Sequence, residues 1–207
     1  MGAVFLKHAV SSMPMVEVFK KYLAEKMKLT DADWAVIESV CIIKKLRKHQ
    51  FLLQEGDVWR FHAFVCKGCL RRYSIDEKGA EHIMQFSIEN WWAGDRDSLM
   101  NKTPARYNID AIEDSVVLVI RNEDFESLCQ QLPAFNNLMN HLIFRSLNAS
   151  QERINTAISL TAEEKYLHFI NTFPLIANRV PRHMVASYLG ITPETLSRIK
   201  SNLSKNK

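Results

Sequence analysis

The C-terminal segment contains the pattern that most restricts the fold: two helical segments that meet at a single glycine. The first segment ends at Leu189, and Gly190 supplies the sharp turn after it. The second begins at Thr192, a favourable N-cap, with Pro193 at the first helical position, where its missing N–H costs nothing. Glu194 then lies in the positive first turn. This order is typical of a helix-turn-helix, whose second helix can enter the major groove of DNA.

The second segment has two chemically different faces. Leu196, Ile199 and Leu203 recur at helical spacing and predict a buried face. The opposite face carries side chains that can bond bases and phosphates. We predict DNA contacts by Arg182, Ser187, Thr192, Glu194, Thr195, Ser197, Arg198 and Lys200.

Positive charge is concentrated in the same region. Six basic residues and one acidic residue lie between positions 179 and 207, a segment charge of +5, whereas the whole chain carries +4. This is the electrostatic footprint that phosphate binding requires. A helical hairpin with a solvated basic face is the alternative, and the turn pattern favours the helix-turn-helix.

Composition places the chain in a broad class. It has 207 residues, 47% hydrophobic and 24% charged, which is typical of a soluble globular protein with one large or two modest domains. Its apolar runs are far shorter than the roughly eighteen residues that cross a bilayer. Residues 1–13 contain Lys7 and His8 and no clean cleavage site, so they do not resemble a signal peptide. We predict a cytoplasmic protein without membrane association.

The four cysteines are too few and too scattered for a disulfide framework. Cys66 and Cys69 have the C-x-x-C spacing of redox and zinc sites, but no second pair or Cys/His partner lies nearby. They flank a Lys67-Gly68 turn between two strand-like runs. Reduced, buried thiols are the favoured interpretation and a redox or metal role is the alternative. We predict no metal site.

The hydrophobic period changes along the chain. Helical spacing over 15–27 and a Thr30–Asp33 capping-box pattern predict helices within 1–40. Between 41 and 120, short runs rich in Val, Ile, Phe and Tyr alternate with turn residues such as Glu55-Gly56-Asp57. Strands spaced so closely indicate an antiparallel sandwich or barrel, which we assign to a domain over 41–133.

The longest helical pattern spans 134–160, before a C-terminal domain over 161–207. An apolar stripe runs along it: Phe135, Leu138, Leu142, Leu147 and Ile154. The stripe is irregular around 146–151. Such a stripe could be buried in the core of the same chain. It could equally form a dimer seam, because coiled-coil pairs use this spacing.

Taken together, these parts resemble the Crp/Fnr (cyclic-AMP receptor/fumarate-nitrate regulator) superfamily of bacterial transcription factors, from about residue 20 to the end. The motifs are Glu55-Gly56-Asp57, Phe64-Val65 with Lys67-Gly68, Gln85-Phe86 before Gly94-Asp95, and the block from Ala186 to Arg198. Glu89-Asn90-Trp91-Trp92 and that last block are similar to a branch found in Bacteroidetes. The resemblance implies an α+β fold: an N-terminal antiparallel β-roll of the cyclic nucleotide-binding jelly-roll type, a long dimerisation helix and a C-terminal winged helix-turn-helix.

The resemblance also implies partners. It places Glu194 and Arg198 at positions that read base edges, and it implies a homodimer paired through residues 134–160. The two recognition helices of such a dimer would meet successive major grooves about 34 Å apart, so the DNA partner would be a palindromic duplex. RNA polymerase is a further implied partner.

A small-molecule effector in the β-roll is the remaining expectation from the resemblance. Cyclic-nucleotide members carry Gly-Glu and then an Arg-Ser pair, and this chain has Gly94-Asp95 and Ala105-Arg106 at the corresponding positions. Arg106 stands one place off the expected position, and such a shift turns a strand side chain to the other face. The sequence therefore predicts another small molecule or none in place of cyclic AMP. Candidate effector residues are Trp92, Gly94, Asp95, Arg106 and Tyr107, although aromatic residues beside a sheet, such as Trp92, more often belong to the core.

These features are compatible with more than one function. The favoured one is a homodimeric, sequence-specific DNA-binding transcription regulator with a cyclic nucleotide-binding-like sensor domain. The alternative is a small-molecule-binding module whose helix-turn-helix serves protein contacts rather than DNA. The chain shows no Ser-His-Asp pattern, phosphate-cradling glycine loop or metal-ligand cluster, so we predict that it is not an enzyme.

Overall fold

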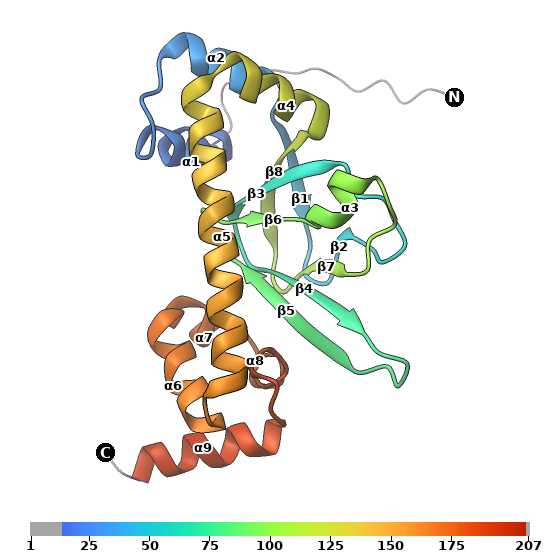
Figure 1. The fold of residues 1–207 in the computed structure, drawn as a ribbon, viewed down its shortest axis with the longest axis vertical. Coiled ribbons are helices and arrows are strands. Elements are labelled where there is room, and N and C mark those ends of the chain that lie inside the picture. The colour runs from blue at the N-terminus through green and yellow to red at the C-terminus, as the bar shows by residue number, and fades with distance from the viewer. Residues whose placement is uncertain (1–13, 206–207) are drawn as a thin grey trace.

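The computed structural model describes residues 14–205, in which a β-roll lies beside one long helix (Figure 1). The N-terminal helices lie at one end of the long helix and the C-terminal helices at the other (Figure 1). None of the helices between residues 14 and 205 combines the length and the apolar character needed to cross a bilayer.

Two four-stranded antiparallel sheets form the β-roll. The first contains, in spatial order, β1 (Ile42–Leu46), β8 (Ser115–Arg121), β3 (Phe61–Lys67) and β6 (Trp92–Ala93). The second contains β2 (Phe51–Leu53), β7 (Asn108–Ala111), β4 (Leu70–Ile75) and β5 (Glu81–Ser87), and α3 (Arg96–Asn101) follows β6. The sheets share a core that includes Leu53, Val65, Leu70, Ile109 and Val119. The predicted antiparallel sandwich is confirmed.

Helices cover the first sheet on its outer side. They are α1 (Pro14–Ala24), α2 (Asp31–Ser39), α4 (Asn122–Gln131) and the start of α5 (Pro133–Ser159). Phe19, Ile37 and Phe64 belong to the core between them and the sheet. The predicted capping box opens α2: the Asp33 N–H donates to Thr30 Oγ1 at 3.1 Å, and the Thr30 N–H donates to the Asp33 carboxylate at 3.0 Å.

The long helix α5 has two different halves. Phe135 and Leu138 are buried in the core against the first sheet, and Leu142 packs against that core. The prediction of a dimer seam is therefore wrong for Phe135 and Leu138, because packing within the chain already covers them. The apolar residues farther along α5 are exposed: Phe144, Leu147, Ile154 and Ile158.

The turn between β3 and β4 explains the C-x-x-C spacing. Gly68 has φ +101°, and a Cβ there would lie 2.1 Å from Ser115 Oγ, so only glycine fits. Cys66 faces the core under α1 and α5, whereas Cys69 faces the C-terminal helices. Burial raises the pKa of each thiol to about 12. These observations support buried, protonated thiols rather than a reactive pair.

The C-terminal unit consists of α6 (Ala162–Thr172), α7 (Pro174–Arg179), α8 (Arg182–Leu189) and α9 (Pro193–Lys205). The resemblance implied a winged unit, but every described element after α5 is a helix. The unit packs on the outer face of the second sheet. Tyr73, Ile83 and Phe86 of that sheet share one core with Phe169 and Leu189. The recognition unit is thus joined to the β-roll through an apolar interface.

Candidate nucleic-acid interface

The turn between α8 and α9 has the geometry that the sequence predicted. Gly190 adopts the left-handed conformation with φ +67°, and its N–H bonds to carbonyl oxygens at the end of α8. The Ile191 N–H then donates to Ala186 O at 3.0 Å. Thr192 accepts from the Thr195 N–H at 3.2 Å, as an N-cap does. Two short helices are therefore held at a fixed angle by local interactions.

The two faces of α9 are separated as their sequence suggests. Leu196 and Ile199 are buried against the rest of the unit, and Leu203 is half-buried. The opposite face presents Thr192, Glu194, Ser197 and Arg198 to solvent, while Thr195 and Lys200 are half-buried. The helix crosses the end of the molecule farthest from α1 and α2 (Figure 1). Its polar face is therefore accessible to a large partner such as duplex DNA.

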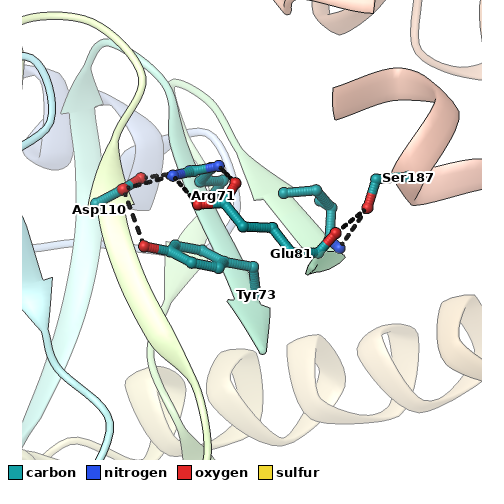
Figure 2. Close-up of polar contacts among 6 residues, drawn as sticks. Arg71, Tyr73, Glu81, Asp110 and Ser187 are labelled. Atoms are coloured by element: carbon teal, nitrogen blue, oxygen red, sulfur yellow. Dashed lines mark hydrogen bonds and ion pairs between the residues drawn. The ribbon is translucent and has the colours of Figure 1, made fainter. Parts of the chain in front are cut away.

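Two other predicted DNA contacts lie on α8 and differ in their surroundings. Arg182 is exposed in the first turn of the helix. Ser187 instead points to the β-roll: its hydroxyl donates to Glu81 O at 2.7 Å and accepts from the Ile83 N–H at 3.0 Å (Figure 2). In this arrangement the Ser187 hydroxyl is already used within the chain.

An ion-pair network centred on the buried Arg71 joins β4, β5 and β7 next to the Ser187 contact (Figure 2). Arg71 donates to both carboxylate oxygens of Asp110, at 2.8 Å and 2.9 Å, and also binds the Glu81 carboxylate. Tyr73 Oη donates to Asp110 at 3.3 Å. Burial alone would lower the pKa of Arg71, but its bonds to Asp110 and Glu81 outweigh it and raise the pKa. The second sheet thus carries a charged network on the face next to α8.

A second arginine lies on the inner face of the same strand. Arg72 donates to Gly94 O at 3.2 Å, and its guanidinium lies 5.2 Å from the centre of the Tyr107 ring. Its Nε is buried and finds no hydrogen-bond acceptor among the described residues. Burial lowers its pKa, and the nearby Asp95 carboxylate opposes that shift. Asp95 itself is buried and caps α3 by accepting from the Ser98 N–H.

Arg179 of α7 makes a further contact between the two parts. It binds the Glu89 carboxylate at 2.7 Å and 3.1 Å and also pairs with Glu113. Burial alone would raise the pKa of Glu89, but bonds from Arg179 and from the Gly68 N–H outweigh it and lower the pKa. Arg179 is therefore neutralised by acids of the β-roll, although the sequence counted it with the basic footprint.

Residues 43–132 match the family described as "Cyclic nucleotide-binding domain". The chain is 26% identical over 174 residues to the regulatory protein HlyX of Actinobacillus pleuropneumoniae, covering 79% of this chain and 72% of that protein. It is 26% identical over 194 residues to the transcriptional activator protein Anr of Pseudomonas protegens, covering 87% and 77%.

A solved structure has a similar fold. FixK2 from Bradyrhizobium japonicum superposes with a TM-score of 0.71 over 81% of this chain and 86% of that one, at 20% identity. The FixK2 match shows that the two chains share a fold. Both sequence relatives are named as regulators, in agreement with the prediction that the chain is not an enzyme.

The effector prediction needs correction at two residues. The Arg106 side chain is 81% exposed and lies 3.8 Å from Asp97, so it points away from the β-roll interior. Trp92 packs against Phe19 and Phe64 in the core on the outer side of the first sheet. Arg106 lies in a bend before β7 rather than in a strand, so its side chain is free to extend into solvent. Trp92 is in the core because its apolar ring packs against other aromatic rings.

The remaining effector candidates, Gly94, Asp95 and Tyr107, do gather in the β-roll, around Arg72. Sequence reasoning missed Arg72, although a signal was available. It follows Leu70 at an interval of two in a strand, so it occupies an inward-facing position where a charge is unusual. Among residues 14–205, no three His, Cys, Asp or Glu side chains are grouped so as to hold a metal ion.

The Arg71–Asp110 pair gives a testable stability prediction. Arg71→Met would leave Asp110 buried without its cation, and we expect the free energy of unfolding to fall by about 3–5 kcal/mol. Arg106→Met is the matched control, because its ion pair is exposed and should contribute less than about 1 kcal/mol. Urea unfolding followed by tryptophan fluorescence measures both variants. Equal midpoints for the two would contradict the role of the buried pair.

Proposed function

We propose that this chain is a homodimeric, sequence-specific DNA-binding transcription regulator with a cyclic nucleotide-binding-like sensor domain. The observation that carries the proposal is α9, whose apolar face is buried and whose polar, basic face is exposed after a glycine turn. A recognition helix needs both properties, one to be held and the other to read DNA. The similarity to the regulators HlyX and Anr supports the same function.

The proposed base contacts are Glu194 and Arg198, which lie four residues apart and therefore on one face of α9. A glutamate can accept from cytosine N4, and an arginine can bond guanine O6 and N7. We assign phosphate or mixed contacts to the neighbouring polar residues, as follows: Arg182, Thr192, Thr195, Ser197 and Lys200. The exposure of Arg182, Thr192 and Ser197 supports this assignment.

The exposed half of α5 supports the proposed homodimer. Phe144, Leu147, Ile154 and Ile158 have between 52% and 80% of their surface exposed. Their spacing of three, seven and four residues places them along one side of the helix, as in a coiled-coil seam. Leu147 and Ile154 remain proposed interface residues from the sequence, and Phe144 and Ile158 join them.

The finer assignments are part of the proposal. We infer a domain over 41–133 that senses, a connecting helix over 134–160 and a DNA-binding domain over 161–207, in a cytoplasmic protein that contacts RNA polymerase. The sensor would take a small molecule other than cyclic AMP, since Arg106 faces solvent. The Glu89-Asn90-Trp91-Trp92 segment supports a place in the Bacteroidetes-type branch.

Salt dependence of DNA binding tests the proposal. If each protomer neutralises three or four phosphates, the logarithm of affinity should fall with the logarithm of salt concentration with a slope of about −5 to −7. Fluorescence anisotropy with a duplex selected from a randomised palindromic library measures the slope. Absence of DNA binding at low salt, with calorimetric binding of a nucleotide, would instead favour a ligand-binding module whose helix-turn-helix contacts protein.

A further inference from the structure

The outer edge of β5 is covered by side chains from the C-terminal half of the chain. In the second sheet β5 pairs with β4 on one side and is the last strand in the described order. Such an edge presents unpaired N–H and C=O groups, which must bond to something when they are taken out of water. Here Ser187 of α8 and Arg153 of α5 supply the bonds.

Ser187 behaves like a residue of an added strand. Its hydroxyl both donates to Glu81 O and accepts from the Ile83 N–H (Figure 2). Arg153 Nη2 completes the edge by donating to Ile83 O at 2.9 Å, and it also donates to Tyr188 O at 3.3 Å. We call these bonds from Ser187 and Arg153 to Glu81 and Ile83 the β5 docking contact.

The β5 docking contact joins three parts of the protein at one point. Arg153 lies on α5, Ser187 on α8 and the bonded strand in the β-roll. The Arg153 guanidinium also lies 4.2 Å from the centre of the Tyr188 ring, and burial lowers its pKa. A desolvated guanidinium with two carbonyl acceptors and a ring beneath it has little freedom to move. The orientation of α8 relative to α5 is therefore fixed here.

Because the turn at Gly190 holds α8 and α9 at a fixed angle, the orientation of α8 also determines the orientation of α9. In a dimer paired through α5, the two copies of α9 must meet grooves about 34 Å apart, so a small rotation of α8 changes the spacing that they match. We propose that Arg153 and Ser187 are positioning residues: the edge of β5 sets the half-site spacing that the dimer accepts. This inference rests on the proposed DNA-binding function. It also reassigns Ser187 from a DNA contact to a contact within the chain.

The β5 docking contact also links the ion-pair network of the β-roll to α8, the helix that precedes the recognition helix. Glu81 bonds Ser187 through its backbone oxygen and Arg71 through its carboxylate, and Arg71 is held by Asp110 of β7 (Figure 2). A shift of β4 or β7 would therefore move the acceptor that orients α8.

The experiment measures spacing preference in the full chain. Duplexes selected by the wild-type protein are remade with the two half-sites one base pair closer or farther apart, and a single half-site duplex is included. For Arg153→Met we expect the preference for the selected spacing to fall about tenfold, with less than about twofold change on the single half-site. Arg121→Met, which removes an exposed arginine at the end of β8, should keep the wild-type preference.

Two results would overturn the inference. One is an unchanged spacing preference in Arg153→Met, and the other is an equal loss on every duplex, which would indicate a direct DNA contact or a damaged fold. Amide hydrogen exchange at Ile83 checks the contact without DNA: Ser187→Ala should accelerate it about tenfold and Ser197→Ala should not. If the wild-type protein binds no duplex, the proposed function fails and the positioning role with it, even where exchange confirms the contact.

Discussion

Replacing Arg198 with alanine is expected to remove most of the preference for a selected operator over unrelated DNA. Arg198 is exposed on α9 and can bond guanine bidentately. Each such pair contributes about 1–3 kcal/mol of discrimination, and a dimer uses it twice, so specific affinity should fall at least about thirtyfold. Binding to unrelated DNA should change little, because it depends on phosphate contacts. Competition titrations at one salt concentration measure both affinities.

Lys205→Ala is the matched control for that experiment. Lys205 lies in the last turn of α9, is exposed and has no assigned base contact. Because Lys205 is assigned no DNA contact, its loss should affect specific and unrelated binding equally, and each by only a small amount. If Arg198→Ala behaves in the same way as Lys205→Ala, Arg198 reads no base and the proposed orientation of α9 is wrong.

The parts of this protein that local chemistry determines were predictable from the sequence. The turn at Gly190, the N-cap at Thr192 and the Thr30–Asp33 capping box each depend on residues within a few positions of one another. The strand-rich composition between 41 and 120 likewise identified the antiparallel sandwich, because turn residues separate its short strands at close intervals. Such features can be predicted without knowing which residues pack against them.

Features that depend on distant partners were not predictable. The stripe on α5 has the same spacing where Phe135 is buried by the β-roll and where Ile158 is exposed, so periodicity could not separate core from seam. Ser187 looked like a phosphate contact because its bonds to β5 join residues more than a hundred positions apart. Arg71 and Asp110 meet only because β4 and β7 are neighbours in the sheet.

A pair of charged substitutions on the exposed half of α5 should separate the proposed dimer. We expect Leu147→Asp with Ile154→Asp to yield monomers at micromolar concentration, measured by sedimentation equilibrium. Burying one such aliphatic side chain contributes about 1.5–3 kcal/mol, and each of the two is lost twice per dimer, which raises the dissociation constant by at least about ten-thousandfold. The exposure of both residues in the single chain means that the monomer should keep its fold.

Leu175→Asp distinguishes a specific seam from general surface hydrophobicity. Leu175 is an exposed leucine on α7, outside the proposed seam, and its replacement should leave the dimer intact. On DNA, the separated protomers should bind a full palindrome no better than a single half-site, because the two recognition helices then act independently. A double variant that remains dimeric would show that the exposed side of α5 is not the seam, and it would also remove the basis for a fixed half-site spacing.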